Sequence, residues 1–347
     1  MSDWKTASVS PEATVREVIA KLNERGGRTV LIVREERLLG TVTDGDIRRA
    51  ILAGIALEAP ITGAMNATPK TVRSTQTRAQ IRTELKRLEV RHLPIVDVEG
   101  RLVGLAEAEE EEKPEWRQNW VLIMAGGRGT RLAPLTERTP KPMLEVGSKP
   151  LLETIVETLK AHRFRRIMLA VHYRAEMVEE YFGDGSRHDV QIEYLHEPEP
   201  RGTAGALAMM SGKVDAPVLV MNGDLLTTLN FDRMLTYHRE KASAVTMAVR
   251  EYSSQVPFGV VRLDDDRVCA LEEKPMQRCI VNAGVYVVEP RVIPPTGEGY
   301  LDMPTFITGL LEQGEPVSAF PIHEYWRDIG RVEDLALASN EYRHVFE

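Results

Sequence analysis

The amino-acid sequence predicts an α/β protein: a domain with a mainly parallel sheet covered by helices, preceded by a smaller α+β domain. With 347 residues the chain exceeds what one hydrophobic core usually supports, so we expect two domains. A run of acidic residues near position 110 separates two parts of different character. In the second part, apolar strand-like segments alternate with helical ones, which is typical of βαβ units.

The boundary between the domains is a charged segment. Residues 107–116 read EAEEEEKPEW, and such a run of charges with a proline cannot form a buried element. We therefore expect a first domain over residues 1–108, a linker over 109–118 and a second domain over 119–347.

Two stretches of the first domain resemble each other. Each has a proline-containing turn, an amphipathic helix, an apolar strand (residues 29–33 and 93–96) and a second strand that ends near Gly40 or Gly104. A repeated helix–strand–strand unit buries its apolar face best against its own copy.

This duplicated unit resembles a pair of CBS domains. The resemblance implies an adenine or guanine nucleotide as ligand, with the ribose hydroxyls held by Thr43 and Asp46. The second copy has Ala106 and Glu109 at the corresponding places and does not offer the same pair. Two alternatives remain: Asp44 and Asp46 only cap the following helix, or the CBS pair only brings subunits together.

Alternating segments of the second domain predict its sheet. Apolar runs favour strands over residues 120–125, 167–171 and 218–222, with helices over 151–161 and 175–182 between them. In such folds, ligands bind at the carboxyl ends of the parallel strands.

A glycine-rich loop follows the first of these strands. Glycines let backbone N–H groups approach an anion, and neighbouring arginines add donors for phosphate oxygens. The loop lacks both GK[ST] and GxGxxG, and many tight turns look similar. A lysine fixed between two prolines, Lys141, strengthens the phosphate interpretation as a point charge held in place. The loop residues are Ala125, Gly126, Gly127, Arg128, Gly129 and Thr130.

The stretch GGRGTRLAPLTERTPKPM, residues 126–143, is similar to the signature of the sugar-1-phosphate nucleotidyltransferases. The resemblance extends over residues 119–347. It implies a Rossmann-like sheet, a nucleoside triphosphate and a sugar 1-phosphate as substrates, Mg²⁺ as cofactor, and a homo-oligomer.

The same resemblance assigns the catalytic residues. It implies that Arg131 and Lys141 neutralise phosphate charge, and that Asp224 and Asp328 hold the metal ion. Each aspartate taken alone also fits a turn or a helix cap.

A later segment is similar to the family's base-binding loop. The resemblance implies nucleotide contacts from Glu197, Gly202 and Thr203. A carboxylate only accepts hydrogen bonds, and guanine offers two adjacent donors where uracil or thymine offers one, so Glu197 favours GTP. UTP stays open, as does a role for Glu197 as acceptor of local backbone groups.

The sugar phosphate is expected on a further set of residues. The resemblance implies that Lys274 pairs with the phosphate, that Glu273 binds sugar hydroxyls, and that Asn282 and Gly284 complete the pocket together with Gly205. Read without the resemblance, residues 272–275 form a solvated turn.

These features predict transfer of a nucleotidyl group to a sugar 1-phosphate. The order of domains resembles enzymes that make GDP-glucosamine from glucosamine 1-phosphate in bacterial legionaminic acid synthesis. Mannose 1-phosphate with GTP and a hexosamine 1-phosphate with UTP are the alternatives. A catalytically inactive regulatory subunit is a hypothesis of another class, but the five charged residues that such a protein would lose are all present: Arg131, Lys141, Asp224, Lys274 and Asp328.

Composition excludes several other classes of protein. The net charge of −8 argues against a nucleic-acid binder, because such binding depends on clustered Lys and Arg. No apolar run approaches the roughly 18 residues of a membrane span, so we expect a cytoplasmic protein without membrane contact. The two cysteines, Cys269 and Cys279, have neither zinc-site nor disulfide spacing.

Overall fold

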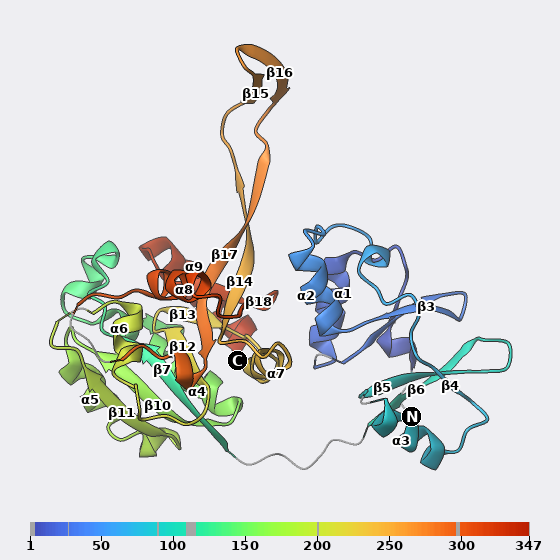
Figure 1. Cartoon of the computed structure of the whole chain (residues 1–347), viewed down its shortest axis with the longest axis horizontal. Coiled ribbons are helices and arrows are strands. Elements are labelled where there is room, and N and C mark those ends of the chain that lie inside the picture. Colours follow the sequence, from blue (N-terminus) through green and yellow to red (C-terminus); the bar gives the residue numbers. More distant parts are fainter. Residues whose placement is uncertain are drawn as a thin grey trace. The chain divides into compact units, whose positions relative to one another are not determined.

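A computed structural model describes residues 4–26, 28–88, 90–108, 116–199, 201–295 and 299–346. The chain divides into two compact units, Met1–Pro114 and Glu115–Glu347 (Figure 1). Residues 109–115 of the predicted linker lie outside the described residues, and strand β7 already begins at Arg117. The last two residues of that predicted linker therefore belong to the sheet of the second unit.

The first unit consists of two copies of one small sheet. In each copy the first strand pairs with the second in parallel, and the second pairs with the third in antiparallel fashion. This repeated topology confirms the duplication seen in the sequence. The first copy contains β1 (Ser8–Val9), α1 (Val15–Glu24), β2 (Val30–Arg34), β3 (Arg37–Val42) and α2 (Asp44–Leu52), and the second contains β4 (Val72–Arg73), α3 (Arg78–Arg87), β5 (His92–Val96) and β6 (Leu102–Glu107).

The two copies share a small core. Leu31 of β2 is fully buried with Leu102 and Leu105 of β6. The backbone N–H of Leu102 also donates to the carbonyl of Glu36 at 2.7 Å. The repeated unit thus buries apolar surface against its own copy, as its sequence predicts.

The second unit is built on a seven-stranded sheet with the order β11-β10-β7-β12-β17-β14-β18. Only β17 runs antiparallel to its neighbours, so the mainly parallel sheet is confirmed. The strands are β7 (Arg117–Met124), β10 (Phe164–Val171), β11 (Gln191–His196), β12 (Val218–Asn222), β14 (Val245–Gln255), β17 (Met276–Val288) and β18 (Val317–Pro321).

Helices cover both faces of this sheet. Val121 and Ile123 of β7 point into one core and Leu122 into the other, because successive side chains alternate across a strand. The first core includes side chains of α4 (Leu151–Ala161), α5 (Ala175–Phe182), α7 (Phe231–Glu240) and α9 (Val332–Phe346), and the second includes those of α6 (Thr203–Ala208) and α8 (Met303–Glu312). Among the described residues, no helix combines the length and apolarity needed to span a bilayer.

Strands β14 and β17 continue beyond the sheet as a two-stranded ribbon, which we call the arm (residues 250–281). Figure 1 shows it leaving the body of the second unit, with the hairpin of β15 (Val260–Asp264) and β16 (Arg267–Glu272) at its tip. The sequence does not predict this projection.

Candidate active site

The glycine-rich loop begins where β7 ends, next to the end of β12. The N–H of Ala125 donates to Ala170, and that of Gly223 donates to Met124 at 3.0 Å. An added Cβ at Gly223 would lie 2.7 Å from the Met124 carbonyl, so only glycine allows these two chain segments to approach so closely. The loop therefore lies at the carboxyl end of the parallel strands.

Gly129 brings Lys141 to this loop. Its φ of +61° favours glycine, and an added Cβ would meet Lys141 Cβ and Thr136 Cγ2 at 3.0 Å. The hydroxyl of Thr136 donates to the carbonyl of Gly129 at 2.8 Å. The loop and the segment around Lys141 are thus packed into one structure.

Asp224 and Asp328 are brought together by a short antiparallel pair of strands. In this pair Leu225 of β13 (Leu225–Thr227) lies opposite Asp328 of β19 (Trp326–Asp328). The N–H of Ile329 donates to the carbonyl of Asp224 at 3.0 Å. Two residues far apart in the sequence are therefore neighbours at the end of the sheet.

A buried lysine links these two acids. Lys141 Nζ lies 2.5 Å from Asp224 Oδ2 and 3.9 Å from Asp328 Oδ1. Burial raises the pKa of the Asp328 carboxyl and the neighbouring Asp224 raises it further, whereas Lys141 and Arg131 oppose the rise. The two carboxyl groups therefore share one buried ammonium group.

The acidic pair has the donors that a divalent cation requires. Oδ1 of Asp224 and Oδ1 of Asp328 are both buried, and neither has a hydrogen-bond partner among the described residues. A buried carboxylate oxygen without a partner is costly unless a cation or water satisfies it. Carboxylate oxygens are also the ligands that Mg²⁺ prefers, so these two residues fit such an ion.

The arginines of the loop are placed differently from Lys141. Arg128 and Arg131 are exposed. An added Cβ at Gly330 would lie 3.7 Å from Arg131 Nη1 and 3.8 Å from Asp328 Oδ1, so the Arg131 guanidinium borders the acidic pair. Its exposed position leaves donors for a bound anion.

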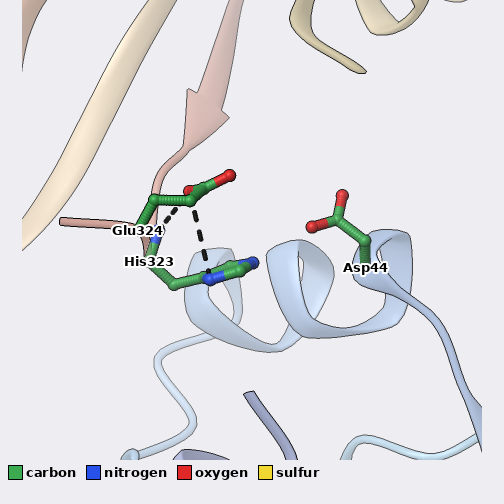
Figure 2. Close-up of side chains that lie close together, drawn as sticks. All are labelled: Asp44, His323 and Glu324. Atoms are coloured by element: carbon green, nitrogen blue, oxygen red, sulfur yellow. Dashed lines mark hydrogen bonds and ion pairs between the residues drawn. The ribbon is translucent and has the colours of Figure 1, made fainter. Parts of the chain in front are cut away.

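The segment that leads into β19 is fixed on both sides. Trp326 Nε1 donates to the carbonyl of Ala283 at 2.8 Å, and Arg250 Nη1 donates to the carbonyl of Glu324 at 3.0 Å. Figure 2 shows Glu324 turned back onto His323, whose backbone N–H donates to Glu324 Oε2 at 2.9 Å. These contacts set the position of Asp328.

Glu197 lies beside the glycine-rich loop. An added Cβ at Gly126 would lie 2.9 Å from Glu197 Oε2, and the Glu197 carbonyl is bonded to His172 Nδ1 at 2.8 Å. Burial raises the pKa of the Glu197 carboxyl, and a backbone hydrogen bond from Arg201 opposes the rise. Oε1 is buried without a hydrogen-bond partner among the described residues, so local backbone groups satisfy this carboxylate only in part.

Three predicted residues of the next segment have structural contacts. Gly202, with φ of +78°, passes close to Leu301, whose carbonyl accepts from the N–H of Gly205 at 3.0 Å. The Thr203 hydroxyl accepts from the N–H of Met303 at 2.8 Å. Gly205 is buried, and an added Cβ would lie 2.5 Å from Arg201 Cβ. Its N–H is thus already used and its surface is covered, and sugar-phosphate binding by Gly205 stays a prediction.

Asn282 and Gly284 lie on β17 next to the end of β12. Asn282 Oδ1 accepts from the N–H of Gly284 at 2.9 Å, and Asn282 Nδ2 donates to Tyr286 Oη at 2.6 Å. An added Cβ at Gly284, whose φ is +72°, would lie 2.7 Å from Asn222 Nδ2. These residues thus border the strand end that carries Asp224.

Glu273 and Lys274 are not brought to this site. Both are exposed in the arm, between β16 and β17. Six residues of extended strand separate Met276 from Asn282, about 20 Å, and Lys274 lies beyond that end. The ladder of the arm therefore holds Lys274 away from Asn282 and Asp224 of the same chain, and binding of the sugar phosphate by Glu273 and Lys274 stays a prediction.

Sequence patterns missed the residues that hold the segment between the glycine-rich loop and Lys141. Tyr173 Oη lies 2.9 Å from the carbonyl of Glu137 and 3.2 Å from that of Thr136, and Arg174 Nη2 donates to Glu137 as well. The one available signal was their position directly after β10, at the carboxyl end of a strand.

In the first unit, Thr43 and Asp46 form a capping box at the start of α2. The hydroxyl of Thr43 accepts from the N–H of Asp46, and Asp46 Oδ2 accepts from the N–H of Thr43 at 2.8 Å. Asp44 instead lies in the first turn of α2 (Figure 2). Arg48 Nε donates to it at 2.8 Å. Helices α1 and α3 have the same kind of cap. Capping therefore accounts for the positions of Thr43 and Asp46, and nucleotide binding by them stays a prediction.

Comparisons with known proteins agree with both units. The sequence profile of the family described as Nucleotidyl transferase matches residues 120–345, and that of the CBS domain matches residues 2–53 and 61–108. The mannose-1-phosphate guanylyltransferase of Mycobacterium tuberculosis is 35% identical over 227 residues, which cover 63% of each chain. The UTP–glucose-1-phosphate uridylyltransferase of Synechocystis is 33% identical over 234 residues, covering 61% of this chain and 60% of that protein.

A solved structure gives the same result for the fold. HddC from Yersinia pseudotuberculosis, in a complex with GMP-PN, is 25% identical with a TM-score of 0.52, covering 65% of this chain and 100% of that one. The chain spans less than two thirds of the length of the two curated relatives. Because the first profile matches more than half of its residues, the chain belongs to the nucleotidyl transferase family, and a pair of CBS domains precedes the matching region.

Proposed function

We propose that this protein transfers a nucleotidyl group from a nucleoside triphosphate to a sugar 1-phosphate, releasing pyrophosphate. The observation that carries the proposal is the acidic pair, Asp224 and Asp328, with its buried lysine beside a glycine-rich loop. The two curated relatives are named as enzymes of this reaction type, one for mannose 1-phosphate and one for glucose 1-phosphate.

The reaction requires two anions to meet in line. An oxygen of the sugar phosphate forms a bond to the α-phosphorus, and the bond from that phosphorus to the bridging oxygen of pyrophosphate breaks. No protein nucleophile takes part, so the protein contributes positioning and charge neutralisation. Arg131 and Lys141 supply positive charge next to the acidic pair.

Mg²⁺ is the proposed cofactor, held by Asp224 and Asp328. When bound, such an ion acts as a Lewis acid and template for phosphate oxygens. Lys141, itself buried, fixes Asp224 through its ammonium group.

GTP is the proposed nucleotide. Guanine has adjacent N1–H and N2–H donors, and Glu197 presents a carboxylate with one buried, unsatisfied oxygen beside the loop. The guanylyltransferase relative and the HddC complex support this choice, whereas the Synechocystis relative is named for UTP. UTP is therefore the alternative to be tested.

Glucosamine 1-phosphate is the proposed acceptor, and the alternatives are mannose 1-phosphate with GTP and a hexosamine 1-phosphate with UTP. Its support is the order of domains, with a CBS pair ahead of the transferase unit. Measuring pyrophosphate release for each nucleotide with each sugar phosphate separates these possibilities.

Replacing either acid should abolish most turnover. We expect Asp224→Asn and Asp328→Asn to lower kcat on the order of 10²-fold or more, because each removes a charged ligand of the proposed cation. Pyrophosphate release is the measurement, with thermal unfolding to show that the variants fold. Asp215→Asn, an exposed carboxylate ahead of β12, is the matched control and should leave kcat unchanged. Near-normal turnover of both site variants would reject the assignment.

Glu197 should make GTP binding depend on pH. Its pKa is raised in the free protein, so the carboxyl takes up a proton as the pH falls through that raised value. The protonated group can no longer accept from both guanine donors, because one of its oxygens has become a donor. We expect GTP affinity to fall in that range, and Glu197→Gln to bind roughly 10-fold to 100-fold more weakly at pH 7.

Calorimetric titration of GTP from neutral to acid pH measures both effects. The titration of the nucleotide itself is common to the two proteins and cancels in the comparison. Equal affinities of the wild type and Glu197→Gln across the range would show that Glu197 does not contact the base.

Two adjacent glycines of the loop should respond differently to alanine. A Cβ at Gly126 would collide with Glu197 Oε2 at 2.9 Å and with His172 Cβ at 3.2 Å, whereas a Cβ at Gly127 meets nothing within 4 Å. We expect Gly126→Ala to weaken GTP binding about 10-fold or more by displacing Glu197, and Gly127→Ala to have little effect. The same loss in both variants would mean that the loop backbone, and not Glu197, sets the affinity.

A further inference from the structure

The arm extends the central sheet beyond an irregularity of the ladder between Met247 and Val249. The ladder between β14 and β17 continues without interruption from Arg250 opposite Val281 to Gln255 opposite Met276. Figure 1 shows this ribbon running away from the helices of the second unit, with the β15–β16 hairpin at its end. With these pairs formed, the ribbon holds the β15–β16 hairpin away from the sheet of its own unit.

The hairpin at the tip has one apolar face. Val261 lies opposite Leu271 and Leu263 lies opposite Val268, so these four side chains lie on the same side of the two strands. They are 47% to 70% exposed. The other face carries Arg262 opposite Ala270 and Asp264 opposite Arg267. This difference between the faces is typical of a strand pair that lies on another surface.

Exposure of this kind is concentrated in the arm. Eight exposed large apolar side chains lie between Tyr252 and Ile280, and Phe258 is the most exposed of them at 72%. A lone two-stranded hairpin is at best marginally stable in water, and a contiguous exposed apolar patch marks an interaction site. The arm therefore requires a surface to cover it.

The arm also carries the two residues that the proposed site lacks. Lys274 and Glu273 follow β16 directly, beside Leu271 of the apolar face. At the acidic pair, Lys141 is already bonded to Asp224, and a phosphate monoester brings about −1.5 to −2 charges at pH 7. The exposed Arg131 has donors for one phosphate, and Lys274 would add a cation for the second.

A second copy of the chain is the occupant that satisfies both needs. It offers an identical site without its own Lys274, and it has an identical arm to give in return. In a two-fold symmetric pair each contact is made twice, so both arms are covered and both sites are completed.

We propose that two copies of this chain exchange arms, so that Lys274 and Glu273 of each copy complete the sugar-phosphate site of the other. This inference rests on the proposed function. The apolar face of β15 and β16 then packs on the partner, and no site is complete in a single chain.

Complementation between two inactive variants tests the exchange. Chains carrying Lys274→Ala and chains carrying Asp224→Asn are coexpressed with different tags, and the mixed oligomer is isolated by two successive affinity steps. In this oligomer one site combines an intact Asp224 with an intact Lys274 from the other chain. We expect about half of the wild-type rate of pyrophosphate release, since one of the two symmetric sites is whole.

The controls make the result specific to the arm. Asp328→Asn replaces Asp224→Asn as a second site variant and should give the same rescue. Adding Val268→Asn and Leu271→Asn to the chain that donates its arm should remove the rescue, whereas Ala270→Asn on the polar face should leave it. A mixed oligomer without activity, or the absence of any mixed oligomer, would overturn the exchange.

A measurement that does not depend on catalysis separates the exchange of arms from the proposed function. Both cysteines of the chain, Cys269 and Cys279, are free and exposed in the arm. A benzophenone maleimide attached to them should cross-link to the second unit of another chain on irradiation, and mass spectrometry locates the joined peptides. Cross-links found only within one chain would overturn the exchange, while cross-linked dimers of a wild type that turns over no substrate would reject only the proposed function.

Discussion

The ion pair of Lys141 with Asp224 is the contact on which the rest of the site depends. It joins the segment after the glycine-rich loop to the end of β12, and β19 adds Asp328 on the other side. A single buried ammonium group beside two carboxyl groups leaves two oxygens unsatisfied. This imbalance is what makes the end of the sheet suited to a cation and to phosphate groups.

Close approaches between backbone segments allow the contact between Lys141 and Asp224 to form. Gly129, Gly223 and Gly284 each lie where a Cβ would meet a neighbouring residue at 3.0 Å or less. The neighbouring residue is Lys141 for Gly129, Met124 at the end of β7 for Gly223, and Asn222 for Gly284. The glycines therefore do more than bend the chain, because they allow three strands and the loop to converge on one point.

Much of this arrangement could be predicted from the sequence. The helices over 151–161 and 175–182 have the predicted bounds, and Asp224 and Asp328 meet as the family resemblance implies. The position of Lys274 could not be predicted, because alternation along β15 and β16 shows a strand pair but not the surface on which it lies. The covering of Gly205 by Arg201 was equally hidden, since the spacing of a motif does not show which of its residues packs inward.

Titration with Mn²⁺, followed by the EPR signal of the free ion, tests the central claim most directly. The account predicts that the wild-type chain binds an ion that is lost in both Asp224→Asn and Asp328→Asn and kept in Asp215→Asn. Binding that survives in both site variants would contradict it, because the carboxylate oxygens of Asp224 and Asp328 that have no hydrogen-bond partner would then not be the ligands.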